Sequence, residues 1–209
     1  MSKKNLADNN FHKKKIIFSI IIPCFNAAKT IERPFLSLLK QTYKNFEVII
    51  VNDGSTDNSS EIIENYLTND PRFILINHFK NSGVANTRNT GLDNVRGKYV
   101  CFLDADDWWP KNKLEVYLEY FKKGYDLLFS DYTRINISNG KTKIVKVIND
   151  LKYKNLIYSN HIPASSAVFN SESLGIPKFK KYHTSSDWIF WLEIFKKKPK
   201  VLGINKNLM

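Results

Sequence analysis

The sequence predicts an α/β protein built on a doubly wound, mostly parallel sheet with helices on both faces. Its strand-like runs, such as Ile16 to Ile22 and Phe46 to Val51, are continuously apolar, as expected of strands that are buried on both faces. Segments with apolar residues at helical spacing separate these runs. Polar and acidic residues follow the runs directly. Because ligands bind beyond the carboxyl ends of the strands in such sheets, these residues mark the expected site.

Strands and helices alternate through the first half of the chain. The predicted strands are Ile16–Ile22, Phe46–Val51, Phe73–Ile76 and Tyr99–Leu103, and the predicted helices between them are Lys29–Gln41, Ser59–Tyr66 and Val84–Asn94. The first helix carries Ile31, Phe35 and Leu38 at helical spacing, which gives it one apolar face. The polar segment "NDGSTDNS" precedes the second helix and provides a turn, with Asp57 as the predicted N-cap.

The second half of the chain is less regular. Its predicted elements are a helix at Leu114–Phe121, a strand at Leu127–Ser130, a hairpin in "INISNGKTKIVKV", a strand at Ile162–Phe169 and a helix at Asp187–Phe195. The hairpin is expected to turn at Asn139-Gly140, because Asn-Gly is typical of tight hairpin turns. No internal repeat or low-complexity linker is present. Residues 16–209 are therefore expected to form a single domain behind a flexible basic tail at residues 1–15.

The composition is that of an ordinary globular protein with a basic charge. The 209 residues include 32 Lys and Arg against 20 Asp and Glu, a formal net charge of +12, which favours an anionic partner. The basic residues are not interleaved with aromatic residues in a compact motif, so no nucleic-acid partner is expected. Cys24 and Cys101 accompany apolar runs without zinc-ligand spacing. They are predicted to be small core residues in a reducing, cytoplasmic compartment.

Three carboxylates crowd the segment "YVCFLDADDWWP" at the end of the fourth predicted strand. Asp104 and Asp106 are two residues apart, so both side chains project to the same side of an extended backbone. Two such carboxylates suit Mg²⁺ or Mn²⁺, which completes its shell with water and phosphate oxygens. The cation would also relieve their mutual repulsion. Asp107 either anchors the turn or a substrate hydroxyl, or it caps the following helix.

Three segments together carry a resemblance to a known family. They are "SIIIPCFNAAKTIERPFLSLLKQTYKNFEVIIVNDGSTDNS", "NSGVANTRNTGL" and "GKYVCFLDADDWWPKNKLE". In this order and spacing they resemble the signatures of the family 2 glycosyltransferases with the GT-A fold, over about Phe18 to Leu202. The resemblance implies transfer of a sugar from a nucleotide diphosphate donor, here a UDP-sugar, to an acceptor hydroxyl with inversion at the anomeric carbon. It also implies a nucleotide-sugar-binding half at residues 16–107 and an acceptor-side half at residues 108–209.

The resemblance gives roles to residues that bind the donor. Pro23, Phe25 and Asn26 match the end of the family's first strand, where the nucleoside is contacted, with core packing as the alternative for Phe25. Asp53 matches the acid that hydrogen-bonds the base or the ribose. Arg88 matches the residue near the nucleotide and diphosphate, with a surface arginine as the alternative.

The resemblance also assigns the acidic segment. Asp104 and Asp106 match the motif that holds Mn²⁺ or Mg²⁺ together with the donor, and Asp107 joins Asp104 in the predicted donor-binding set. A divalent ion bridging the diphosphate oxygens stabilises the charge that develops on the leaving group.

The general base of the family comes from a Glu-Asp pair that opens a late helix. The matching segment here is "SSDWIFWLEIF", in which Asp187 is kept and Ser186 replaces the glutamate. Asp187 is therefore the predicted general base, with helix capping as the alternative and Asp131 or Glu193 in reserve. Trp188 and Trp191 line either the acceptor site or, at this helical spacing, the core. 

Two functions stay open at the end of the chain. Many family members continue past the segment matched by "VLGINKNLM" with a histidine that can complete the metal shell, whereas this chain stops at Met209. The first function is an active transferase that uses water as that ligand, and the alternative is a non-catalytic sugar-nucleotide-binding or scaffold module left by C-terminal truncation. A nucleotidyltransferase is disfavoured because "PCFNAAKT" has no glycine for a triphosphate loop.

The resemblance and the charge together suggest partners. The expected acceptor is a glycan or a lipid-linked hydroxyl in cell-surface polysaccharide biosynthesis. No run of about 20 apolar residues, the length that spans a bilayer, is present. The basic residues would instead attach a cytoplasmic protein peripherally to the inner face of the membrane.

Overall fold

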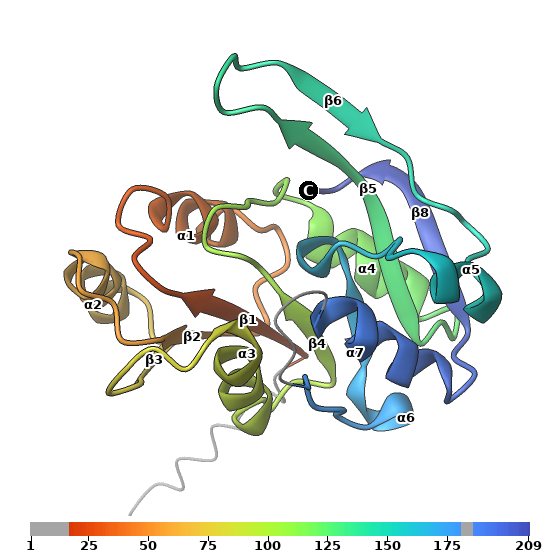
Figure 1. Ribbon diagram of the computed structural model, residues 1–209, viewed down its shortest axis with the longest axis horizontal. Coiled ribbons are helices and arrows are strands. Elements are labelled where there is room, and N and C mark those ends of the chain that lie inside the picture. The colour runs from red at the N-terminus through yellow and green to blue at the C-terminus, as the bar shows by residue number, and fades with distance from the viewer. Residues whose placement is uncertain (1–16, 181–185) are drawn as a thin grey trace, which may run out of the picture.

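An eight-stranded sheet forms the centre of the protein (Figure 1). The computed structural model describes residues 17–180 and 186–209. The strands are β1 (Phe18–Cys24), β2 (Phe46–Asn52), β3 (Phe73–Asn77), β4 (Tyr99–Phe102), β5 (Leu127–Ile135), β6 (Thr142–Val145), β7 (Val168–Asn170) and β8 (Val201–Asn207). Their order is β3-β2-β1-β4-β7-β5-β6, with β8 paired to β5. From β3 to β4 all neighbours are parallel, and β7 is antiparallel to β4 and β5. The predicted mostly parallel sheet is confirmed.

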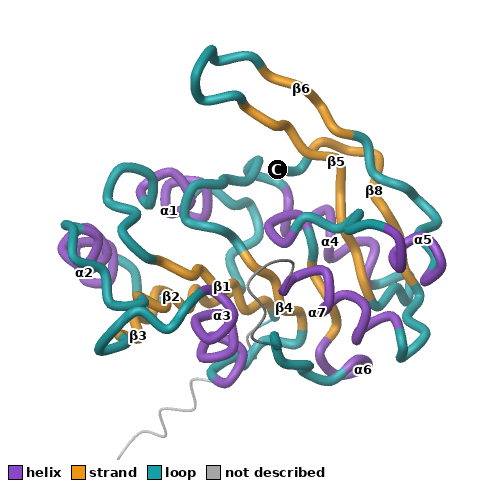
Figure 2. The backbone as a smooth tube through the Cα atoms, viewed as in Figure 1, coloured by secondary structure: helices purple, strands orange, loops and turns teal. Residues whose placement is uncertain are grey.

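Helices cover both faces of this sheet (Figure 2). They are α1 (Glu32–Leu39), α2 (Ser59–Asn69), α3 (Val84–Asp93), α4 (Lys113–Phe121), α5 (Tyr153–Tyr158), α6 (Ser171–Leu174) and α7 (Ser186–Phe195). Side chains of α1, α2 and α4 share one core with Ile20 and Ile22 of β1, whereas those of α3, α5, α6 and α7 share a second core with Ile21. Consecutive side chains of a strand point to opposite faces. A strand between two cores must therefore be apolar throughout, which explains the continuous apolar runs.

The first-half elements agree with the prediction apart from their ends. The tail at residues 1–15 and the predicted strand start at Ile16 lie outside the described residues. Helix α1 begins at Glu32, three residues after the predicted start, because the amides of Thr30 and Ile31 both donate to the Ala27 carbonyl in a preceding turn (2.9 Å each). Cys24 and Cys101 are buried free thiols, so their prediction as core residues is confirmed.

One predicted strand in the second half is wrong. The segment Ile162–Phe169 contains a 3₁₀ helix at Ala164–Ser166, and only β7 after it is extended. The carbonyls of Ser165 and Ser166 accept hydrogen bonds from the side chains of Trp109, Lys113 and Tyr117. They are therefore not free to pair with a neighbouring strand.

The predicted hairpin is present between β5 and β6 and projects from the body of the protein (Figure 1). Its connection is longer than a two-residue Asn-Gly turn, because the Asn136 amide donates to the Lys141 carbonyl at 2.8 Å and closes the whole segment 136–141. Gly140 has φ +67°, a left-handed conformation that glycine adopts without strain.

The loop after β2 lies close to the segment that precedes α3. Gly54 has φ +70°, and a Cβ added there would lie 2.8 Å from the backbone carbonyl carbon of Lys80. A side chain at position 54 would therefore be strained twice, by the backbone conformation and by this contact. The close approach brings Asp53 to the start of α3, where it contributes to the site.

Candidate active site

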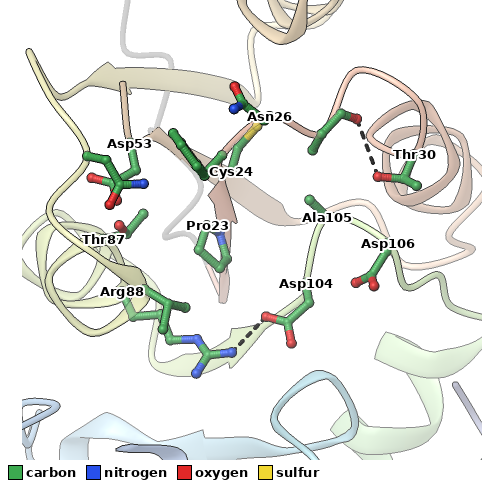
Figure 3. A pocket seen from close by; sticks show the side chains of 14 residues that line it. Pro23, Cys24, Asn26, Thr30, Asp53, Thr87, Arg88, Asp104, Ala105 and Asp106 are labelled. Carbon is green, nitrogen blue, oxygen red and sulfur yellow. Dashed lines mark hydrogen bonds and ion pairs between the residues drawn. The ribbon is translucent and has the colours of Figure 1, made fainter. Parts of the chain in front are cut away.

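A cavity of about 510 Å³ opens at the carboxyl ends of β1, β2 and β4, beside the first turns of α3 (Figure 3). Seven of the residues predicted for the site line it: Pro23, Phe25, Asn26, Asp53, Arg88, Asp104 and Asp106. They come from loops that are far apart in the sequence and meet because parallel strands end at one edge of the sheet. Asp107 and Asp187 are not in its wall.

The loop after β1 is fixed to the loop after β2 by hydrogen bonds. The Asn26 side chain accepts one from the Thr56 amide at 2.8 Å, and the Asn26 amide donates to the Ser55 hydroxyl at 3.0 Å. Asn26 has φ +49°, a conformation that asparagine tolerates better than most residues. Phe25 is 48% exposed at the cavity wall, so its alternative assignment to the core is wrong.

Asp53 is buried, and its carboxylate is occupied by donors of the chain itself. It accepts hydrogen bonds from the amides of Ser82 and Gly83, from the Ser82 hydroxyl and from the His78 ring, at 2.6–3.0 Å. Burial acts to raise the pKa of Asp53, but these hydrogen bonds outweigh it and hold the pKa below its ordinary value. Its first role is therefore to fix the start of α3, the helix that carries Arg88.

Replacing Asp53 by asparagine is expected to lower the free energy of unfolding by about 2–3 kcal/mol at pH 7, because a buried amide donor would face amide donors. The folded-state pKa is lowered, so the carboxylate's contribution is fully present above the ordinary pKa of about 4 and is lost as the pH falls through the folded-state value. Urea unfolding should show that the difference in the free energy of unfolding between the wild type and Asp53→Asn becomes smaller below about pH 4. Asp150→Asn, at a side chain 80% exposed, is the control. A difference in the free energy of unfolding that stays constant down to pH 2 would contradict the assigned hydrogen bonds.

Arg88 and Asp104 form an ion pair across the floor of the cavity. An Arg88 Nη donates to Asp104 Oδ1 at 2.7 Å (Figure 3). The guanidinium carbon lies 5.7 Å and 5.3 Å from the ring centroids of Phe102 and Phe179. Arg88 is only 6% exposed and its Nε has no hydrogen-bond partner among the described residues. The alternative of a plain surface arginine is therefore wrong.

Asp106 is the exposed acid of the segment. It projects from the loop after β4 toward the cavity, as Asp104 does (Figure 3). No described cation forms an ion pair with Asp106. The described residues contain no cluster of three or more His, Cys, Asp and Glu side chains that could enclose a metal. Two carboxylates open to a cavity nevertheless fit Mg²⁺ or Mn²⁺, which takes only one or two from the protein when phosphates and water complete its shell.

Asp107 faces a second cavity of about 520 Å³, which shares Thr30 and Asp106 with the first. Burial raises the pKa of Asp107 to about 6, the neighbouring carboxylates of Asp104 and Asp106 act in the same direction, and a hydrogen bond with Ser165 opposes them. Asp107 thus lies next to the predicted metal ligands in the sequence, but its side chain is partly buried and hydrogen-bonded to Ser165. The helix-cap alternative for Asp107 is wrong, because α4 begins at Lys113 with Asn112 as its N-cap. Its role as an anchor of the turn or of a substrate hydroxyl stays a prediction.

Asp187 lies in the first turn of α7 and is partly exposed. Its Oδ2 accepts a hydrogen bond from the Asn160 side chain at 3.0 Å. The reserve candidates for the base are less accessible or already paired: Asp131 is fully buried and forms an ion pair with the exposed Lys146, and Glu193 pairs with Lys196. Trp191 is fully buried, so its core assignment is confirmed.

Several residues of the site carry no signal in the sequence. Thr30, Asn81, Val84 and Thr87 line the cavity without belonging to a recognisable pattern. Lys113 is fully buried, although lysine is ordinarily read as a surface residue. The available signal is its place in α4, next to Leu114 and one turn before Tyr117, both of which are buried.

A sheet that is parallel from β3 to β4, with an acidic loop after β4 and a cavity at its carboxyl edge, is typical of the GT-A class of glycosyltransferases. The family model for "Glycosyl transferase family 2" matches residues 19–177. The chain belongs to glycosyl transferase family 2 and is a glycosyltransferase.

Curated relatives agree with this assignment. A putative teichuronic acid biosynthesis glycosyltransferase, TuaG of Bacillus subtilis, is 32% identical over 202 residues, covering 93% of this chain and 78% of the relative. The UDP-Glc:alpha-D-GlcNAc-diphosphoundecaprenol beta-1,3-glucosyltransferase WfgD of Escherichia coli is 32% identical over 181 residues, covering 86% and 70% of the two chains.

Solved structures share the fold. TarS 1-349 of S. aureus in complex with UDP-GlcNAc superimposes with a TM-score of 0.78 at 23% identity, over 92% of this chain and 57% of that chain. The mannosyltransferase PcManGT of Pyrobaculum calidifontis, in complex with GDP-Man and Mn²⁺, gives a TM-score of 0.67 at 19% identity, over 91% and 54%. This chain thus spans little more than half the length of these structural neighbours.

Proposed function

We propose that this protein is an inverting, metal-dependent glycosyltransferase that uses a UDP-sugar donor. The acceptor is a hydroxyl of a glycan or a lipid-linked sugar in cell-surface polysaccharide biosynthesis. The observation that carries the proposal is the meeting of Asp104, Asp106 and Arg88 in one cavity with the loop after β1. The UDP-GlcNAc complex of TarS and the diphosphoundecaprenol acceptor in the name of WfgD support the choice of donor and acceptor.

The nucleoside end of the donor is proposed to lie on the loop after β1, beside Pro23, Phe25 and Asn26. Phe25 offers an exposed ring there, and Asn26 sets the shape of the loop. Because the Asp53 carboxylate is occupied by four neighbouring groups, we assign it to the cavity wall and to the start of α3 instead of to a direct base contact.

The diphosphate is proposed to lie over the acidic loop. Asp104 and Asp106 would hold Mn²⁺ or Mg²⁺, which supplies Lewis-acid stabilisation of the departing diphosphate when it is bound. Arg88 has a buried guanidinium, whose Nε finds no hydrogen-bond partner in the part of the chain that the structure describes. It adds a fixed positive charge where negative charge develops, at no reorganisation cost during the reaction.

The acceptor hydroxyl is proposed to lose its proton to Asp187. Asn160 donates a hydrogen bond that orients Oδ2 of Asp187. The carboxylate would then act as a general base and accept the proton of the hydroxyl. Nucleophilic attack at the anomeric carbon from the face opposite the diphosphate then inverts its configuration.

The test is a panel of UDP-, GDP- and dTDP-sugars with Mn²⁺. A thermal shift that requires both a UDP-sugar and Mn²⁺ is expected, since a ligand that binds only the folded state stabilises it. Mass spectrometry should then detect sugar transfer or slow donor hydrolysis that EDTA abolishes. Tight UDP binding without turnover on any acceptor would instead indicate a non-catalytic sugar-nucleotide-binding module. No UDP-dependent shift would contradict both.

Peripheral membrane association belongs to the same proposal. Among the described residues, no helix has the length and apolar character to cross a bilayer. A cytoplasmic enzyme acting on a lipid-linked acceptor would reach it from the inner face of the membrane, helped by a net charge of +12. Co-sedimentation with anionic vesicles at low salt is expected, and its absence would contradict this part.

A further inference from the structure

Lys113 is a buried lysine that the catalytic proposal does not use. It opens α4 and is 0% exposed. Its Nζ donates hydrogen bonds to the carbonyls of Ser165 and Ser166 at 3.0 Å and 3.1 Å. It also lies 4.5 Å and 4.9 Å from the ring centroids of Trp109 and Tyr117. No described carboxylate forms a salt bridge with Lys113. Burial lowers the pKa of Lys113 to about 7, and the attraction of the Asp107 charge offsets only part of this effect.

The turn that Lys113 holds is also the turn that holds the acidic loop. The Ser165 hydroxyl accepts a hydrogen bond from the Asp104 amide at 3.0 Å and is hydrogen-bonded to the Asp107 side chain. The Ser165 carbonyl accepts a second bond from the Trp109 indole at 2.8 Å. Asp104, Asp107 and Trp109 of the acidic loop are thus all hydrogen-bonded to Ser165. Lys113 donates hydrogen bonds to the carbonyls of the same turn.

The three carboxylates of the acidic loop differ in the positive charges that act on them. Arg88 pairs with Asp104. A positive charge on Lys113 acts to lower the pKa of Asp107, but burial outweighs it and raises that pKa to about 6. Asp106 alone has no described cation as a partner. The arrangement fixes two acids of the loop and leaves the third open to the cavity.

We propose that Lys113 is a positioning residue, whose side-chain nitrogen fixes the turn at Ala164–Ser166 by its two hydrogen bonds and thereby sets the geometry of Asp104 and Asp107. Lys113 does not touch the donor. It acts through Ser165, and without it the two carbonyls lose a shared hydrogen-bond donor and the loop loses its support. The methionine side chain fills a similar volume without donors or charge, so Lys113→Met removes this function while keeping the core filled.

Hydrogen exchange of the metal-free protein tests the link. In Lys113→Met, amides of residues 104–107 are expected to exchange about tenfold faster than in the wild type, while those of α2 keep their rates. Leu114→Ala, at the equally buried next residue, is the matched control. It should leave the ratio of loop to α2 rates unchanged. A uniform acceleration in Lys113→Met, or none, would overturn the proposal.

If Lys113→Met does not fold, Ser165→Ala tests the same connection from the loop side. It removes the acceptor of the Asp104 amide, and the same local acceleration of about tenfold is expected. Wild-type exchange in residues 104–107 of this variant would overturn the proposal.

A second readout rests on the proposed function, namely the Mn²⁺ concentration needed for half-maximal UDP binding. It should rise about tenfold in Lys113→Met and stay unchanged in Leu114→Ala. An unchanged requirement in Lys113→Met would overturn the positioning role. If the wild type shows no Mn²⁺-dependent UDP binding, the proposed function fails, while the exchange experiment still decides the role of Lys113.

Discussion

Replacing Asp106 by asparagine is expected to lower sugar transfer about a thousandfold while leaving the fold intact. Asp106 is exposed at the cavity and has no described ion-pair partner. Its charge is therefore the one in the acidic loop most available to a divalent ion. Asparagine keeps the shape and removes that charge. Transfer from a UDP-sugar, followed by mass spectrometry with saturating Mn²⁺, measures the loss.

Stability separates this effect from damage to the structure. Asp106→Asn should change the free energy of unfolding by no more than about 0.5 kcal/mol, as for other exposed positions. Asp104→Asn would also remove a proposed metal ligand, but in addition it breaks the ion pair with the buried Arg88. We expect it to lose both activity and stability. Wild-type activity in Asp106→Asn, or activity of the wild type that survives EDTA, would rule out metal dependence through this loop.

The first half of the fold is predictable because one physical constraint sets both its sequence and its structure. β1 (Phe18–Cys24) and β2 (Phe46–Asn52) lie between two helical layers, so every position of both strands has to be buried or nearly so. Apolar runs of this kind mark strands without reference to other parts of the chain. The polar residues that end them then meet at one edge, which places Asn26, Asp53 and Asp104 together before any contact is known.

The turn at Ser165 could not be predicted in this way. Whether the Ser165 and Ser166 carbonyls join a strand ladder depends on donors from Trp109, Lys113 and Tyr117, more than 40 residues earlier in the chain. The sequence shows apolar residues on both sides and predicts a strand. Only the tertiary structure shows that these side chains donate to both carbonyls, which are then not available to a neighbouring strand.

The charge balance of the acidic loop was predicted in part. Crowded carboxylates require compensation, and a divalent ion was expected to provide it. The structure shows that the chain provides some of it, through the ion pair of Arg88 with Asp104. This pairing does not follow from spacing, since the second half of α3 and the whole of β4 separate Arg88 from Asp104 in the sequence.

Replacing Asp187 by asparagine is expected to lower kcat by about 10² to 10⁴ and to leave UDP affinity unchanged. The amide cannot accept the acceptor's proton, whereas the donor cavity contains no atom of Asp187. Asn160 donates to Oδ2, and no described residue occupies Oδ1, so one oxygen is free for the hydroxyl. Steady-state kinetics with a saturating acceptor, together with calorimetry of UDP binding, separates the two quantities.

The helix-cap alternative for Asp187 predicts a different pattern, because asparagine caps a helix as well as aspartate does. If capping were its only role, Asp187→Asn would keep both kcat and stability. Glu193→Gln is the matched control on the same helix, since Glu193 pairs with Lys196 and Lys180. It should retain kcat within about twofold, as expected of a surface ion pair that contributes little. A large loss in Glu193→Gln with none in Asp187→Asn would move the general base to Glu193 and would require the acceptor to approach along the other side of α7.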